Sequence, residues 1–423
     1  MYFKKVILDD ISKGKGSYGI GASAVDYNPS LYKYLRITDI SDDGEINSNE
    51  LMSVDDENAC KYLLEENDIV FARTGNSTGK SYFYNKKDGV LVYAGFLIKF
   101  TLDDKKVNPK FMKYYTKSYE YKNWLKSIST GSTRKNINAK MYGSMEIQLP
   151  PRSQQDSMVN LLSKIDKKNE INKEINNNLE QQIQLLFEEW FMKFEFPNNL
   201  NKPYKSSGGK FKETNYGSIP LDWTDGILED ILILTKNNIK KENLKDLPYL
   251  PIDIIPMNSL SIKEFKNNDE AKSSLITFDK NDILIGAMRV YFHRVSIAPC
   301  AGITRNTCFV LKPYDDKYLG YALLLCNEDR TINYADITSK GSTMPYASWK
   351  NGLNKMPIVI PPLDIIEQFN EIIKPYLIKI RDSGFELEKL TKLRDTLLPK
   401  LMSGETDVSE INFDLNPEES TIK

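Results

Sequence analysis

Glycine-rich polar loops hold the side chains of this sequence that are best suited to chemistry. The segment Arg-Thr-Gly-Asn-Ser-Thr-Gly-Lys at 73–80 follows an apolar run, and a second polar stretch follows Gly131. Arg, Lys and Asn side chains hydrogen-bond phosphate oxygens and the polar edges of nucleobases. A nucleotide-binding P-loop is not predicted, because three residues separate Gly75 from Gly79 where that motif needs four. Six residues are candidate nucleic-acid contacts: Arg73, Asn76, Lys80, Arg134, Lys135 and Asn136.

The C-terminal half has a comparable set of polar residues. It includes the segment 287–294 and the triplet Gly-Ser-Thr at 341–343. The candidate contacts there are Arg289, His293, Arg294, Arg305, Lys340, Ser342 and Thr343.

Catalytic and metal-binding chemistry has little support. His293 is the single histidine. This excludes metal sites with several histidines, and it excludes a histidine-based catalytic triad unless His293 is the base. The four cysteines have no CxxC spacing, so we expect no metal site and no disulfide framework. Asp253, Glu264 and Lys266 mimic the carboxylate–carboxylate–lysine set of metal-dependent nucleases, but the match is short.

A tandem duplication of about 210 residues organises these loops. Asn-Asp-Ile-Val at 67–70 recurs as Asn-Asp-Ile-Leu at 281–284. Ile-Leu-Asp-Asp-Ile at 7–11 recurs as Ile-Leu-Glu-Asp-Ile at 227–231. The Gly-Ser-Thr triplets and the Pro-Pro pairs at 150–151 and 361–362 recur in the same order. Equal scaffolds with different polar loops would recognise different base sequences.

Each copy has the same predicted layout. Short apolar runs broken by Gly, Asn, Asp and Pro predict a mixed α/β domain, and a Pro-Pro pair precedes a long helical segment. The predicted fold is α+β, with two similar mixed α/β domains separated by two long helices that pack as an antiparallel coiled coil. The predicted parts are domain 1 (1–150), a helix (151–196), domain 2 (197–360), a second helix (361–404) and a flexible acidic tail (405–423).

Apolar residues at alternating steps of three and four predict the helix seam. We expect a kink or a helix end at Pro375, and three asparagines (169, 172 and 176) interrupt the first seam, where they are either buried or facing water. The predicted packing residues are Leu162, Ile165, Leu179, Ile183, Leu186, Phe369, Ile373, Ile380, Leu387, Leu390 and Leu397.

Charge and hydropathy set the expected environment. The formal net charge is −1, but residues 1–150 and 197–360 each carry a small basic excess, which permits a nucleic-acid surface. No apolar run resembles a signal peptide or a membrane span, so we expect a cytoplasmic protein.

The organisation resembles the specificity subunits of Type I restriction–modification systems. The resemblance rests on LPPRSQQ at 149–155, YGSIPLDW at 216–223, IPPLDIIEQ at 360–368 and LRDTLLPKLMSG at 393–404, in this order. It implies a non-catalytic chain in which two target recognition domains each read half of a split double-stranded DNA site. The helices would set the spacer and dock two methyltransferase subunits, which would carry AdoMet. Nuclease subunits of the complex would use ATP and Mg²⁺.

Two other functions remain open from the sequence. One is a self-sufficient restriction nuclease or methyltransferase. The other is a coiled-coil scaffold with two protein-binding heads, which would bind no DNA in a salt-dependent way.

Overall fold

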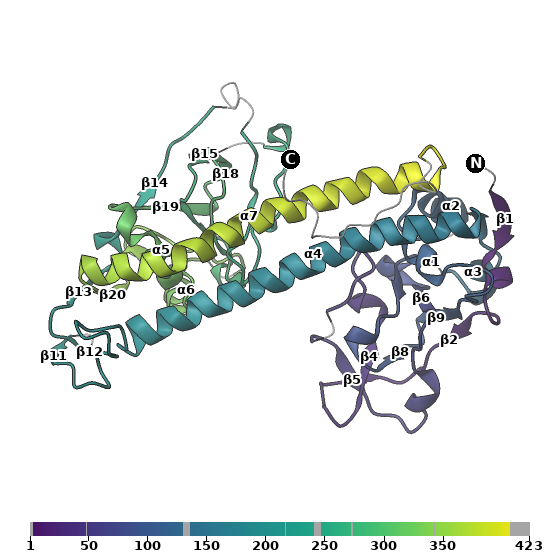
Figure 1. Cartoon of the computed structure of the whole chain (residues 1–423), viewed down its shortest axis with the longest axis horizontal. Coiled ribbons are helices and arrows are strands. Elements are labelled where there is room, and N and C mark those ends of the chain that lie inside the picture. The colour runs from purple at the N-terminus through teal and green to yellow at the C-terminus, as the bar shows by residue number, and fades with distance from the viewer. Residues whose placement is uncertain are drawn as a thin grey trace, which may run out of the picture. The chain divides into compact units, whose positions relative to one another are not determined.

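A computed structural model describes residues 3–47, 49–129, 136–215, 217–240, 247–271, 274–341 and 343–406. The chain divides into two compact units, unit 1 (1–167 with 392–423) and unit 2 (168–391), so each unit takes part of both long helices. Figure 1 labels the elements of both units. No helix in the described ranges is long and apolar enough to cross a membrane.

Unit 1 is built from short strands and three short helices. One four-stranded sheet has the order β2-β9-β6-β7, another has the order β3-β5-β4-β8, and β1 pairs with β10. The strands are β1 (Lys4–Ile7), β2 (Ser17–Tyr18), β3 (Ala24–Val25), β4 (Tyr32–Leu35), β5 (Met52–Val54), β6 (Asp68–Ala72), β7 (Ser81–Phe83), β8 (Leu91–Tyr93), β9 (Leu97–Thr101) and β10 (Glu146–Leu149). The helices are α1 (Pro109–Tyr115), α2 (Tyr119–Ser129) and α3 (Ala139–Gly143).

The core of unit 1 lies where these helices cover the sheet of β6 and β9. Strand β6 is buried along its whole length, and Phe71 stacks on Tyr142 with ring centroids 4.7 Å apart. Tyr114 and Tyr121 are buried in the same cluster, and Trp124 packs at its edge.

Unit 2 repeats part of this plan, with one four-stranded sheet in place of two and a further pair, β11 with β12. Its four-stranded sheet has the order β14-β19-β16-β17, β13 pairs with β20, and β15 pairs with β18. The strands are β11 (Phe211–Thr214), β12 (Gly217–Pro220), β13 (Thr224–Ile227), β14 (Leu232–Thr235), β15 (Leu275–Phe278), β16 (Ile283–Gly286), β17 (Val295–Ile297), β18 (Gly302–Arg305), β19 (Cys308–Pro313) and β20 (Pro357–Ile360). The short helices are α5 (Leu319–Cys326) and α6 (Asp329–Ile337).

The duplication is visible in matching backbone details. Asn67 and Asn281 both have positive φ angles, 72° and 73°, at the turn before the buried strand. The next residue stabilises that turn in both copies: Asp68 Oδ2 accepts the N–H of Glu65 at 2.8 Å, and Asp282 Oδ2 accepts the equivalent N–H at 2.7 Å. The pseudo-repeat predicted from sequence is therefore a repeat of structure.

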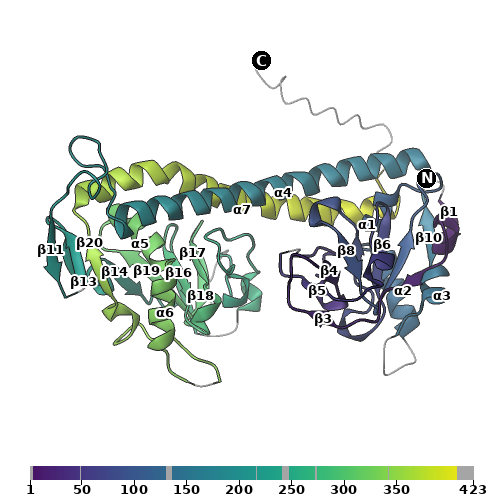
Figure 2. The same cartoon turned by 90° about the horizontal axis from the view of Figure 1, so that it is seen from below.

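Two long helices follow the two domains: α4 (Arg152–Phe187), which continues as a π-helical turn (Glu188–Met192), and α7 (Leu363–Met402). They lie side by side in Figures 1 and 2. Within unit 2, Lys168 pairs with Glu386 at 3.3 Å, and Phe187 packs on Phe369. Phe187 is nearer the C-terminus of α4 than Lys168 is, whereas its partner Phe369 is nearer the N-terminus of α7 than Glu386 is, so the two helices are antiparallel.

The predicted seam residues lie mainly in this helix pair's interior. In unit 2, Ile183, Phe369, Ile373 and Ile380 belong to one core cluster, with Leu179 and Leu186 packed at its edge. In unit 1, Leu162 belongs to the buried core cluster, and Leu397 packs against that cluster. Ile165 and Leu387 are also buried, and Leu390 is half-buried.

A polar layer interrupts the seam in unit 2. Asn169, Asn172 and Asn176 are all buried, so they do not face water, and Ser383 of α7 is 1% exposed. The Asn176 amide nitrogen approaches Ser261 Oγ at 3.4 Å. Neither polar atom of the Asn172 side chain has a hydrogen-bond partner among the described residues.

The helix end that was one of the two expectations at Pro375 does not occur. Helix α7 runs without interruption from Leu363 to Met402. Pro375 removes one backbone donor, but both Pro375 and Glu371, whose carbonyl loses that donor, are exposed. Water can therefore satisfy the free carbonyl, and the packed apolar face holds the helix together.

Candidate nucleic-acid interface

The two polar loops occupy the same place in the two copies. In each unit the loop follows the buried strand of the main sheet, β6 or β16. Thr74 bridges Asn136, and Met288 bridges Tyr346 in the same antiparallel way. The backbone contact beside each bridge also matches, since Ile137 N–H donates to the Arg73 carbonyl at 2.9 Å and Ala347 N–H to the Ala287 carbonyl at 2.8 Å. A shared scaffold thus presents different side chains at one position.

Gly79 shows why the first loop is rich in glycine. Its φ is +90°, a conformation that favours glycine, and a Cβ there would lie 2.5 Å from Leu125 of α2. Its carbonyl accepts a hydrogen bond from the Tyr121 hydroxyl at 2.7 Å. The loop is therefore held closely against α2.

Arg73 and Asn136 meet, although 63 positions separate them. Arg73 Nε donates to Asn136 Oδ1 at 3.3 Å. The guanidinium carbon also lies 4.8 Å from the centre of the Tyr18 ring, a cation–π contact. Asn76 is exposed in the short 3₁₀ turn Gly75–Ser77. Arg134 and Lys135 lie outside the described residues, so their predicted role stays a prediction.

Lys80 points elsewhere. Its Nζ lies 2.9 Å from Asp42 Oδ1 and donates to the Ile40 carbonyl at 3.1 Å. The hydrogen bond from Lys80 lowers the pKa of Asp42. Lys80 lines a small pocket of about 30 Å³ that Lys117 also lines. Burial, with the charge of Lys113, lowers the pKa of Lys117, and no hydrogen-bond partner for its Nζ is found in the described part of the chain.

The second loop contains two strained residues. Arg289 and His293 both have left-handed backbones, with φ of 50° and 49°. Arg289 N–H donates to the Pro345 carbonyl at 2.8 Å, while its Nε is buried without a hydrogen-bond partner among the described residues. Such strain in bulky residues is typical of functional loops whose surroundings fix the backbone.

His293 and Arg294 are held inside unit 2. His293 Nε2 lies 2.9 Å from the Asn327 carbonyl, and Nδ1 lies 3.4 Å from Asp329 Oδ1. Arg294 donates to the Asp253 carbonyl at 3.1 Å, and burial lowers its pKa. These contacts give both side chains a role in holding the loop.

The remaining predicted residues of unit 2 are on the surface. Arg305 is exposed at the end of β18, and Lys340 and Thr343 are exposed in the loop that bridges to Tyr346. Ser342 lies outside the described residues. The structure thus brings Arg289 next to the 340–346 loop and leaves Arg305 on another strand.

Sequence reasoning missed the exposed apolar residues beside the loops. In unit 1, Tyr18 is 41% and Phe96 59% exposed, and Arg73 N–H donates to the Phe96 carbonyl at 3.0 Å. In unit 2, Tyr291 and Met344 are similarly exposed. These four residues share no periodic apolar pattern, so no signal in the sequence separates them from core residues.

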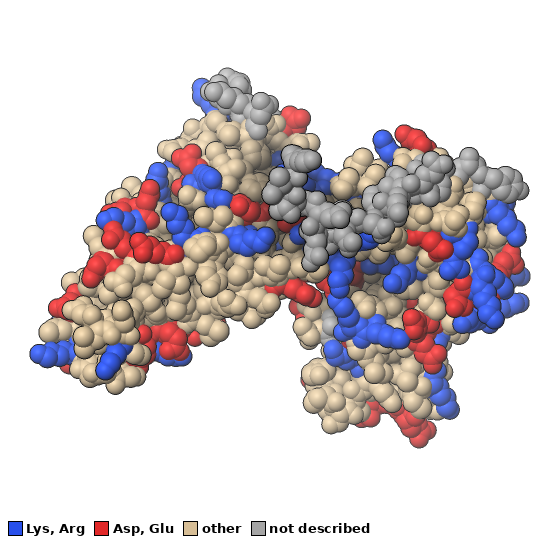
Figure 3. All heavy atoms as spheres, viewed as in Figure 1, with Lys and Arg blue, Asp and Glu red and all other residues tan. Residues whose placement is uncertain are grey.

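Charge alone does not mark an interface. On the face shown in Figure 3, Lys and Arg side chains are interspersed with Asp and Glu over both units. Recognition would therefore depend on particular side chains more than on one broad basic patch.

The candidate nuclease set does not form a site. Asp253 is exposed in a short 3₁₀ turn and lies 3.9 Å from Lys266, so it is not on a strand beside a second carboxylate. No group of three or more His, Cys, Asp or Glu side chains in the described ranges is arranged to hold a metal ion.

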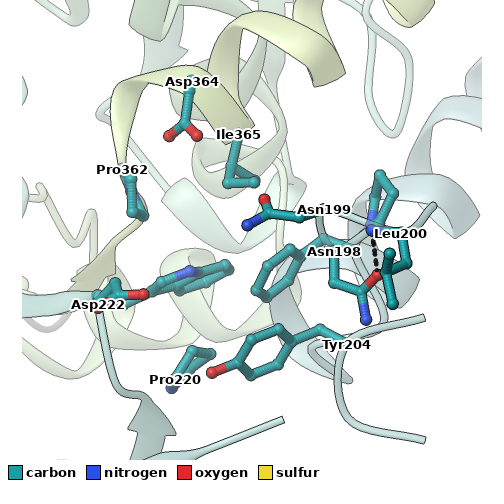
Figure 4. Close-up of a pocket in the computed structure, with 12 residues that line it drawn as sticks. Asn198, Asn199, Leu200, Tyr204, Pro220, Asp222, Pro362, Asp364 and Ile365 are labelled. Atoms are coloured by element: carbon teal, nitrogen blue, oxygen red, sulfur yellow. Dashed lines mark hydrogen bonds between the residues drawn. The ribbon is translucent and has the colours of Figure 1, made fainter. Parts of the chain in front are cut away.

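A separate pocket of about 440 Å³ lies at the start of α7, where Pro362, Asp364 and Ile365 form one wall (Figure 4). Phe196 stacks between Tyr204 and Trp223, with centroid distances of 4.6 and 4.9 Å. None of the predicted nucleic-acid contacts lines this pocket. Its aromatic wall joins the segment after α4 to the core of unit 2.

Two copies of one scaffold, with different polar loops at the same position, define a duplicated recognition protein. The chain belongs to the family of Type I restriction modification DNA specificity domains, whose model matches residues 3–181 and 220–392. It is accordingly the DNA specificity subunit of a Type I restriction–modification system, the component that is not catalytic.

Relatives match most of the chain. The Type I restriction enzyme MjaIX specificity subunit of Methanocaldococcus jannaschii is 28% identical over 320 residues, covering 71% of this chain and 70% of its own length. The HindI specificity subunit of Haemophilus influenzae is 20% identical over 405 residues, covering 82% and 88%. The crystal structure of a Type-I restriction-modification system S subunit from M. genitalium has a similar fold, with a TM-score of 0.58, 16% identity, and coverage of 95% and 96%.

Proposed function

We propose that the chain binds a bipartite site in double-stranded DNA and that each unit reads one half-site. The loop after β6, with Arg73, Asn76 and Asn136, would read the first half-site. The loop after β16, with Arg289 and the exposed Lys340 and Thr343, would read the second. Arg305 would contact DNA from β18.

The observation that carries this proposal is the matched position of the two loops. The Thr74–Asn136 and Met288–Tyr346 bridges place them identically on equivalent sheets. Yet Arg73 on one scaffold corresponds to Ala287 on the other, by the shared backbone hydrogen bond. Different side chains at equivalent positions of one scaffold are what reading two different half-sites requires.

The helices and the partners complete the proposal. The antiparallel pair of α4 and α7 would set the spacer and dock two methyltransferase subunits, with nuclease subunits joining the complex. AdoMet would bind the methyltransferase subunits, and ATP and Mg²⁺ the nuclease subunits.

The test is co-expression with the methyltransferase chains, followed by genome sequencing for methylated adenines. The expected result is one split motif, together with DNA binding that weakens as salt rises. Binding without salt dependence, or methylation without a motif, would exclude the proposal.

Asp253→Ala is a matched control for the nuclease alternative. Since Asp253 is exposed and belongs to no group of side chains in the described ranges that could hold a metal ion, we expect its substitution to leave the methylation motif unchanged. Metal-dependent cleavage by the purified chain, abolished by Asp253→Ala, would favour that alternative instead.

A further inference from the structure

The Arg73 side chain is held in place before any ligand binds. Its guanidinium lies 4.8 Å from the centre of the Tyr18 ring, and its Nε is engaged by Asn136 Oδ1. Its backbone is fixed on both sides, by Phe96 and by Ile137. Tyr18 is fixed in turn, because its hydroxyl accepts the N–H of Ala139 at the start of α3 at 3.1 Å.

The outer edge of the guanidinium is available. In the described part of the chain, Arg73 has no ion pair, and the Asn136 contact through Nε is its side-chain hydrogen bond. The two terminal nitrogens therefore keep their N–H groups, which point in parallel as a planar fork. A fork of this kind matches two adjacent acceptors in one plane.

In the major groove, guanine presents such a pair, O6 and N7. The surroundings of Arg73 favour a base over a phosphate. Phe96 and Tyr18 beside it are 59% and 41% exposed, and apolar rings suit contact with base edges and thymine methyl groups. The nearby Lys80, which would suit a phosphate, is already paired with Asp42.

The second copy shows that the scaffold does not need this arginine. Ala287 makes the same backbone hydrogen bond at the equivalent position in unit 2. Alanine is therefore compatible with the fold at this position. The Arg73 guanidinium, which Tyr18 and Asn136 orient, must serve something other than folding.

We propose that Arg73, positioned by Tyr18 and Asn136, reads one guanine of the unit 1 half-site by donating two hydrogen bonds to its O6 and N7. This inference rests on the proposed function and names the base that this loop recognises.

The experiment uses the full chain assembled with its methyltransferase subunits and the DNA motif found by methylation sequencing. Each guanine of the half-site is replaced in turn by 7-deazaguanine, which lacks the N7 acceptor, and affinity is measured by competition. A good bidentate contact is worth roughly 5- to 150-fold in affinity, and 7-deazaguanine removes one of its two hydrogen bonds, so at one guanine we expect a loss in the lower part of that range. Arg73→Ala, which removes both hydrogen bonds, should bind the native site more weakly by a larger factor within the range and should lose no more on the 7-deaza site.

Two further variants separate orientation from charge. Arg73→Lys keeps the charge without the fork and should lose the discrimination. Tyr18→Ala should reduce discrimination at the same guanine, and Tyr18→Phe, which keeps the ring, should restore most of it. Arg152→Ala is the matched arginine control, because its guanidinium is bound by Asp156 and the Asp104 carbonyl.

Two outcomes would overturn the inference. If Arg73→Ala weakens binding equally on all sequences and lowers the salt slope by about 1, Arg73 contacts phosphate. If 7-deazaguanine changes affinity equally for wild type and Arg73→Ala, Arg73 does not read that base. Failure of the wild-type complex to bind any split motif would instead exclude the proposed function itself.

Discussion

Replacement of the buried Asn172 by leucine tests the energetics of the helix pair. Asn172 is 1% exposed, and both polar atoms of its amide lack partners among the described residues. A buried polar group without a hydrogen bond costs about 1–3 kcal/mol. Leucine has the same branched skeleton and contributes apolar burial in place of that cost. We expect Asn172→Leu to stabilise unit 2 by about 2 kcal/mol.

For a unit of this size, that stabilisation raises the midpoint of thermal unfolding by about 4–8 °C. Scanning calorimetry of the full chain measures it, as a shift of the transition of unit 2. The control is Asn178→Leu on the same helix, because Asn178 is exposed and its replacement buries nothing. A lower midpoint for Asn172→Leu would refute the reasoning, since it would mean that the amide is hydrogen-bonded, for instance by water within the layer.

Three further predictions concern other parts of the molecule. The pKa of Lys117 is lowered, so its charged form is disfavoured in the folded state, and the protein becomes more stable as pH rises from the folded pKa toward 10.5. Lys117→Met should therefore raise the midpoint of thermal unfolding at pH 8 and lose that advantage by pH 11. An equal difference between variant and wild type at both pH values would contradict this prediction. Trp223→Ala should destabilise unit 2 by about 3–5 kcal/mol in denaturant unfolding, because the indole is 1% exposed and packs among three phenylalanines. A loss of stability under about 1 kcal/mol would contradict this prediction and would mean that neighbouring side chains fill the cavity. If the helices set the spacer as proposed, inserting seven residues after Lys167 in α4 and after Thr391 in α7 should lengthen the DNA spacer by about 3 base pairs, because seven helical residues add roughly 10 Å. Methylation sequencing should find both half-sites unchanged, and an altered half-site would argue against a spacer role.

The repeat could be predicted because it is preserved where backbone geometry demands particular residues. The Asn-Asp pairs at 67–68 and 281–282 recur because the first must adopt a positive φ and the second must cap the turn. The helix seam could be predicted because its apolar spacing matches the helical period.

Other features depend on distant contacts that no local pattern encodes. Lys80 contacts Asp42 and Ile40, which lie about forty positions earlier, so its position in a glycine-rich loop could not reveal this ion pair. The spacing of the asparagines left their burial open, and only packing against Ser261 and α7 decides it. Tyr18 is placed in the candidate site by the pairing of β2 with β9 and by the contacts of its side chain with Arg73 and Ala139.

The strand pairs β1–β10 and β13–β20 have a consequence for how such proteins change. Lys4 lies opposite Leu149, and Thr224 lies opposite Ile360, so the chain enters and leaves each α/β domain at adjacent points. Because its two ends are adjacent, each α/β domain can be exchanged for another domain of the same kind without changing the long helices α4 and α7. New binding preferences can therefore arise by recombination at these two strand pairs, while both long helices are inherited unchanged.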